Sequence, residues 1–162
     1  MKTIIIGGPR SGKSTMAISY GVPVFCADPK SLVKDVLPGV TYLPDSVDWE
    51  NQSHYICQNW FPMQGDWVIE GVGCIRALRK WINYYDTTPP CYNIVFIRDK
   101  HPMASDLLPG QLSMRKSIDS IWNEIGHNFE SITQHKYWGS FELKSEPVER
   151  IEKSNSFRIF KG

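Results

Sequence analysis

The chain has 162 residues, about the size of one ordinary domain. Hydrophobic residues make up 41% of it and charged residues 22%, a composition that excludes an intrinsically disordered chain. A formal net charge of +1 excludes a protein that holds long stretches of nucleic acid by overall charge alone, but it leaves room for a locally basic cleft.

Short apolar runs alternate with helical patterns along the chain. Residues 3–6 form a β-branched run without polar alternation, as in a strand buried on both faces. Similar runs predict strands at 22–27, 67–69 and 93–97, and a last strand at 157–160. Helical spacing and stop signals predict helices at 13–20, 31–36, 48–60, 75–85 and 113–125.

This alternation predicts one α/β domain over residues 1–162. We expect three layers, with a central parallel sheet of about five strands and helices on both faces. Right-handed crossovers would bring the carboxyl ends of the strands, and the loops after them, to one functional edge.

The first predicted strand runs into a glycine-rich loop, Gly7-Gly8-Pro9-Arg10-Ser11-Gly12-Lys13-Ser14, followed by Thr15. The loop satisfies the pattern G-x-x-x-x-G-K-[ST], with a strand before it and a helix after it. Gly7 and Gly12 would permit backbone angles closed to other residues, so that successive N–H groups converge on phosphate oxygens. The predicted fold is therefore a P-loop fold that binds ATP through Gly8, Pro9, Arg10, Ser11, Gly12, Lys13, Ser14 and Thr15.

Two residues of this loop have specific expected roles. The Lys13 ammonium would reach the β- and γ-phosphates and act in catalysis, and the Ser14 hydroxyl would ligand Mg²⁺. The alternative is an ordinary strand-to-helix turn, which the complete motif in its strand and helix context disfavours.

Asp28 follows the second predicted strand, directly before Pro29. A carboxylate at that point would face the γ-phosphate, where it could orient a substrate hydroxyl and accept its proton. Small nucleoside kinases have a Glu-Pro at the same topological point, so Asp28 resembles their catalytic acid with one methylene less. The alternatives are a turn-forming aspartate and, as a substitute base, Asp35.

Glu70 ends the third predicted strand, before Gly71. An acid there corresponds to the Walker B position, could hold Mg²⁺ through water, and is also a candidate for binding the substrate. The pattern of three hydrophobic residues, Glu and Gly also resembles pairs that many kinases place at this point. The alternative is an acid that caps the helix beginning near Ile75.

Three arginines are candidates for contacts to phosphate groups. Arg76 and Arg79 are three residues apart on the predicted helix 75–85, so they share a face and could clamp a substrate or DNA phosphate. A solvated basic face beside Lys80 is the alternative. Arg115 opens the helix 113–125, within a lid region expected at about 100–127, and could supply transition-state charge.

Four aromatic residues lie between the second and third predicted strands, where the P-loop kinases that the chain resembles build their acceptor site. Their faces could stack on a base, and the alternative is an ordinary hydrophobic core. The four are Trp49, Tyr55, Trp60 and Phe61.

The chain resembles the nucleoside and nucleotide kinase group of P-loop proteins. Its loop looks like that of adenosylcobinamide kinase, which shares the Arg-Ser-Gly-Lys-Ser core, but the later histidine-bearing segment of that enzyme is not found. Over roughly the first 125 residues, the loop together with residues 69–72 and 75–81 is similar to the phage kinases of 5-hydroxymethyluracil in DNA. This resemblance implies transfer of the ATP γ-phosphoryl group to the hydroxymethyl of a pyrimidine in DNA.

Two other functions remain open at this level. A free nucleoside or nucleotide kinase would use the same residues on a small acceptor, and the near-neutral charge favours it over DNA. A nucleotide-dependent ATPase or regulatory module would use Glu70 to position water. The four cysteines are widely spaced and form no CxxC pair, which predicts free thiols in a reducing cytoplasm. No apolar run is long enough to span a bilayer, so we expect no membrane partner. The resemblance to phage kinases implies that this cytoplasm is that of a phage-infected bacterium.

Overall fold

The computed structural model describes residues 1–28, 33 and 36–138. Most of the predicted helix at 31–36, with Asp35, and the predicted strand at 157–160 lie outside the described residues. The described part contains a six-stranded, all-parallel sheet with the order β3-β2-β4-β1-β5-β6. The predicted α/β fold is therefore confirmed, whereas the expected number of about five strands is one too low.

The sheet is built from two long central strands and shorter outer ones. The strands are β1 (Lys2–Gly7), β2 (Val24–Cys26), β3 (Val40–Tyr42), β4 (Trp67–Glu70), β5 (Asn93–Ile97) and β6 (Thr133–Lys136). β1 lies between β4 and β5, and Ile4, Ile5 and Ile6 are fully buried. A strand covered on both faces needs apolar residues at every position, which is the pattern that predicted it.

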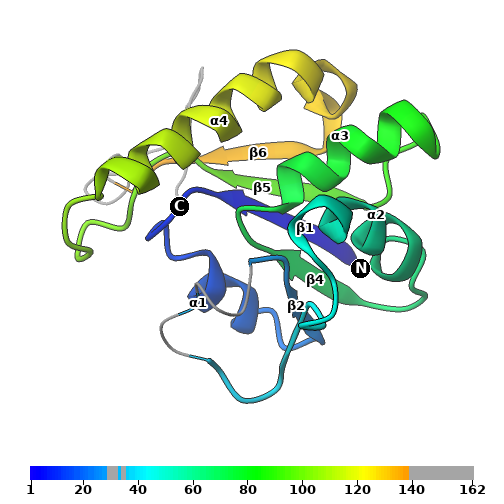
Figure 1. Cartoon of the computed structure of the whole chain (residues 1–162), viewed down its shortest axis with the longest axis horizontal. Helices are drawn as coiled ribbons and strands as arrows, with labels where there is room; N and C mark the ends of the chain where they lie inside the picture. The colour runs from blue at the N-terminus through cyan, green and yellow to red at the C-terminus, as the bar shows by residue number, and fades with distance from the viewer. Residues whose placement is uncertain (29–32, 34–35, 139–162) are drawn as a thin grey trace.

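Helices cover both faces of the sheet (Figure 1). Among the residues that the structure describes, one face carries the short α1 (Lys13–Ile18), which packs through Ala17 on Ile5, Val68 and Val95. The other face carries α2 (Gln52–Tyr55), α3 (Cys74–Tyr84) and α4 (Pro109–Ile125), over a larger core. The predicted three-layer arrangement is thus the observed one.

The helical elements differ from the predictions at their ends. The segment predicted as one helix at 48–60 is a 3-10 turn (Trp49–Asn51), α2 and a π-helical turn (Ile56–Trp60). α4 begins at Pro109, earlier than predicted, because proline suits the first position of a helix, where its missing N–H is not needed. The expected lid region, residues 100–127, consists of most of the loop after β5, all of α4 and the start of the 3-10 turn Gly126–Asn128.

Because the strands are parallel, the loops after β1, β2, β4 and β5 meet at one edge of the sheet (Figure 1). The register pairs Glu70 with both Cys26 and Ile5, so β4 and β2 end at the same level, and β1 continues for two residues beyond it, to Gly7. This edge is where a doubly wound sheet places its ligands. It holds the glycine-rich loop, Asp28 and Glu70.

Candidate functional site

The glycine-rich loop connects β1 to α1 and owes its shape to two left-handed residues. Gly12 has a φ of 86°, as the sequence predicts, and Arg10 has a φ of 60°, which is uncommon for a residue with a side chain. The expectation that Gly7 also needs an unusual backbone angle is wrong. Gly7 is needed because a Cβ there would collide with the Ser11 hydroxyl, which folds back against it.

Lys13 turns its side chain back into the loop and is only 6% exposed. Its Nζ donates a hydrogen bond to the Gly8 carbonyl at 3.2 Å and lies 3.6 Å from Asp28 Oδ2. A buried ammonium has a high desolvation cost unless anionic groups surround it. The loop therefore holds a positive charge at the point where its backbone curves, as a phosphate site requires.

Asp28 is held at the sheet edge by the loop after β4. The Val72 N–H donates to Asp28 Oδ1, while Oδ2 faces Lys13. Gly71 makes this approach possible, since it has a φ of 135° and a Cβ there would lie 2.7 Å from Asp28 Oδ1. The sequence predicted a role for Asp28 and a Glu-Gly pair after the third strand, but not that Gly71 and Val72 hold the Asp28 carboxylate.

Glu70 lies deeper than Asp28 and is 1% exposed. Its Oε2 accepts a hydrogen bond from Ser14 Oγ at 3.0 Å, and its Oε1 is buried without a partner in the described part of the chain. Burial, and then the nearby charge of Asp28, raise the pKa of Glu70, while Lys13 acts against them. A bound cation would offset the desolvation cost of this buried carboxylate and give its unpartnered oxygen a ligand bond.

The side chains around Glu70 fit a hard divalent cation. The ligand atoms of Cys26, Asp28 and Glu70 all lie within 4.8 Å of one another. Two carboxylates and the Ser14 hydroxyl are the oxygen donors that Mg²⁺ prefers. Burial and the charge of Glu70 raise the pKa of the Cys26 thiol, which keeps its sulfur protonated and unsuited to Mg²⁺. Ser14 and Glu70 are thus brought together as predicted.

Arg115 reaches the loop from α4. Its Nη2 donates to the Arg98 carbonyl at 2.6 Å, and its aliphatic stem lies against Gly8, where a Cβ would come 3.3 Å from the Arg115 Cγ. The second cationic side chain predicted for the phosphate site therefore lies beside the first half of the loop. It comes from a different element than Lys13, so the two charges approach from different directions.

A second set of contacts holds the other half of the loop, and sequence reasoning missed it. Trp138 Nε1 donates to the Ser11 carbonyl at 2.8 Å, and the His101 N–H donates to the Arg10 carbonyl at 2.7 Å. The rings of His101 and Trp138 lie 4.6 Å apart, and Asp99 accepts from the Trp138 N–H. Nothing in the local sequence signals these contacts, because 127 positions separate Ser11 from Trp138.

Arg76 and Arg79 share one face of α3, as predicted, but have different neighbours. The Arg76 guanidinium lies 3.7 Å from the centroid of the Trp49 ring, and Arg79 forms an ion pair with Glu124 at 3.3 Å. Burial, and then the neighbouring Arg79, lower the pKa of Arg76. An anion bound between the two would relieve this repulsion.

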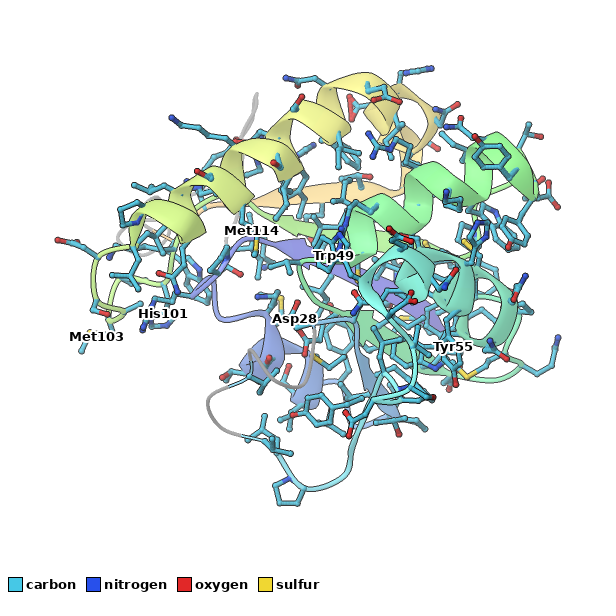
Figure 2. The ribbon with its side chains drawn as sticks, viewed as in Figure 1. Asp28, Trp49, Tyr55, His101, Met103 and Met114 are labelled. Carbon is cyan, nitrogen blue, oxygen red and sulfur yellow. The ribbon has the colours of Figure 1, made fainter. Side chains whose placement is uncertain are left out.

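The four aromatic residues considered for the acceptor site divide into two groups. Trp60 and Phe61 are buried in the core, so the ordinary core interpretation is correct for them. Tyr55 packs against the same core. Trp49, in contrast, is 55% exposed and lies over Arg76 near the start of α3 (Figure 2).

Comparisons of the chain with protein-family models, with curated proteins and with solved structures find no match. The described residues contain no helix with the length and apolar character that crossing a membrane requires. The geometry of the site is therefore the basis for any functional conclusion.

Proposed function

We propose that this protein is an ATP-dependent kinase that transfers the γ-phosphoryl group of ATP to a hydroxyl group. One observation supports the proposal most strongly. The loop lysine Lys13, the Ser14–Glu70 pair and the Asp28 carboxylate, which come from the ends of three strands, converge at one edge of the sheet. Phosphoryl transfer needs cations for the phosphates, a metal site and a base for the acceptor, and these residues supply each.

The burial of the two carboxylates supports different roles for them. The Asp28 side chain is 17% exposed and has its second oxygen directed to Lys13, while Glu70 is 1% exposed. A general base must reach the acceptor, so Asp28 takes that role. Glu70 and Ser14 would hold Mg²⁺, which when bound neutralises charge on the β- and γ-phosphates.

The acceptor hydroxyl gives its proton to Asp28, and its oxygen forms a bond to the γ-phosphorus. The bond between that phosphorus and the oxygen bridging to the β-phosphate breaks, and ADP leaves with the electron pair. Lys13 and Arg115 stabilise the charge that develops on the transferred group.

For the acceptor we propose the hydroxymethyl group of 5-hydroxymethyluracil in phage DNA, with a free nucleoside or nucleotide as the second candidate. The exposed Trp49, stacked on Arg76, supports an acceptor with a planar ring, and Arg79 supports one with a phosphate. Both acceptors fit a cytoplasmic enzyme without a membrane partner.

The test offers three acceptors to the protein with γ-³²P-labelled ATP and Mg²⁺: DNA containing 5-hydroxymethyluracil, free hydroxymethylated nucleosides and nucleotides, and water. Label on DNA or on the free acceptor supports the kinase and identifies its substrate. Release of labelled phosphate alone, with no acceptor labelled, would contradict the kinase and favour an ATPase module.

A further inference from the structure

An apolar cavity of about 330 Å³ lies between the start of α3 and the middle of α4. Half of its ten lining residues have aliphatic or thioether side chains, Trp49 and Arg76 also line it, and Gly110, Ser113 and Ser117 complete the wall. Such volumes and linings are typical of sites for small organic groups. The aliphatic residues of the wall are Val72, Ile75, Met114, Ile118 and Ile121.

This cavity adjoins the proposed reaction centre on two sides. Val72 lines it and also donates its N–H to Asp28. Ile118 lines it and also borders the hollow beside Gly8 and Arg115. Figure 2 shows Met114 beside α4, Trp49 near the start of α3, and Asp28 lower in the view, near α1. A group bound in the cavity would therefore have a substituent within reach of the Asp28 carboxylate.

The stacked pair of Trp49 and Arg76 separates the cavity from a second hollow. This basic cleft of about 460 Å³ follows the outer face of α3. It is lined by Arg76, Arg79 and Lys80, against a single acidic residue, Glu50. Lys80 lies 5.1 Å from the Tyr84 ring and has no carboxylate partner among the described residues, so the cleft has a net positive lining.

We propose that the cavity and the cleft together bind one nucleotide unit of the acceptor. The heterocyclic base enters the apolar cavity beside Trp49, and its phosphate lies in the cleft near Arg79 and Lys80. This inference rests on the kinase function proposed above and specifies its acceptor. A mononucleotide and a nucleotide in a DNA strand present the same chemistry, and both would bind here.

Three physical points favour a nucleotide over other small molecules. A planar base can cover the exposed Trp49 ring and the aliphatic wall at once, because both of its faces are apolar. The Arg76 guanidinium can stack on the base or turn to the phosphate. The cleft and the cavity share Trp49 and Arg76 in their linings, so the cationic side chains of the cleft lie next to the cavity. A nucleotide needs this arrangement, because its base and its phosphate are close neighbours.

The first experiment fills the cavity. Met114→Trp places an indole inside it, and Tyr92→Trp places an indole at a residue that is 67% exposed, just before β5. KM is measured for 5-hydroxymethyl-dUMP, for an oligonucleotide containing 5-hydroxymethyluracil and for ATP. We expect Met114→Trp to raise KM for both acceptors by about tenfold or more, equal to ~1.4 kcal/mol, with KM for ATP unchanged. Tyr92→Trp should change none of the three.

The second experiment uses the cleft, where Lys80 is only partly buried and its substitution is compatible with folding. Lys80→Gln should weaken the binding of 5-hydroxymethyl-dUMP and of the oligonucleotide but leave the binding of the phosphate-free nucleoside unchanged. Lys2→Gln is the matched control, because Lys2 is the first residue of β1, at the end of that strand away from the phosphate loop. Calorimetric titration of each protein with 5-hydroxymethyl-dUMP measures the same contacts without turnover.

These measurements separate this inference from the kinase proposal. Normal acceptor KM values in a folded Met114→Trp protein would overturn the base site. An equal effect of Lys80→Gln on nucleoside and nucleotide would overturn the phosphate site. If the protein binds 5-hydroxymethyl-dUMP in a way that Met114→Trp abolishes, yet transfers no phosphoryl group, the binding site stands and the kinase function fails.

Discussion

The phosphate loop and the α3–α4 face lie at the same edge of the sheet but are built in different ways. The loop is one contiguous segment whose own glycines, lysine and serine supply most of the site. The α3–α4 face combines Trp49, Val72, Arg76 and Met114, which only packing brings together. The proposed nucleotide end of the site is therefore encoded locally, whereas the proposed acceptor end depends on the placement of whole helices.

The sharpest test of the loop side is Lys13→Ala. We expect phosphoryl transfer to fall by more than about 10³-fold, because the lysine stabilises charge on the transferred group. Radiolabel transfer measures the loss. Circular dichroism and thermal unfolding should show a folded protein, since the ammonium contributes little to the core. A folded variant with near-normal transfer would contradict the kinase proposal.

Asp28→Asn tests the point where the two regions meet. We expect kcat to fall by about 10²–10⁴, the usual contribution of a positioned general base, while ATP affinity is preserved. Asp45→Asn, at an exposed residue away from the site, is the matched control. Steady-state kinetics and nucleotide titration together check the expectation. Normal turnover would make Asp28 a turn residue, and equal loss of ATP affinity would assign it to metal binding.

The acceptor side is tested by Arg76→Ala and Arg79→Ala. We expect each to raise KM for DNA containing 5-hydroxymethyluracil while leaving KM for ATP nearly unchanged. If either holds a backbone phosphate, its loss lowers the slope of log affinity against log salt by about one unit. Activity is compared across salt concentrations on DNA and on the free nucleotide. Salt-insensitive wild-type activity on DNA would move the assignment to a free nucleotide kinase.

The smallest effect is expected from Glu70→Gln, measured as stability without nucleotide or metal. Burial and Asp28 raise the pKa of Glu70, so the folded state loses stability as pH rises above the ordinary glutamate pKa of about 4.3. Removing the charge should therefore raise Tm at neutral pH by about 2–4 °C, equal to about 1 kcal/mol.

Two further outcomes make the Glu70 measurement decisive. Below about pH 4 the gain in Tm should vanish, because the wild-type carboxyl is then protonated in both the folded and the unfolded state. Mg-ATP should stabilise the wild type more than the Gln variant. A variant that is less stable than the wild type at neutral pH would show that other groups already offset the desolvation cost of the Glu70 charge without a cation.

The elements that the sequence predicted well are those with a strong local pattern. β5 has the predicted bounds, and β1 and β4 are close to theirs, because strands buried on both faces need unbroken apolar runs. The two missed strands, β3 and β6, are edge strands. β6 reads Thr-Gln-His-Lys and has only partly buried or exposed side chains, so its pairing with β5 leaves no hydrophobic pattern to recognise.

The glycine-rich loop, its position between a strand and a helix, and the acidic residues at the strand ends, Asp28 and Glu70, could all be identified from the amino-acid sequence. Those features follow from backbone sterics and from the direction of parallel strands. The folded structure was needed to show that Gly71 makes room for the Asp28 carboxylate and that Trp138 holds the loop at Ser11. It alone separated the exposed Trp49 from the buried Trp60, because burial depends on which surfaces meet when the helices pack, and no local pattern records that.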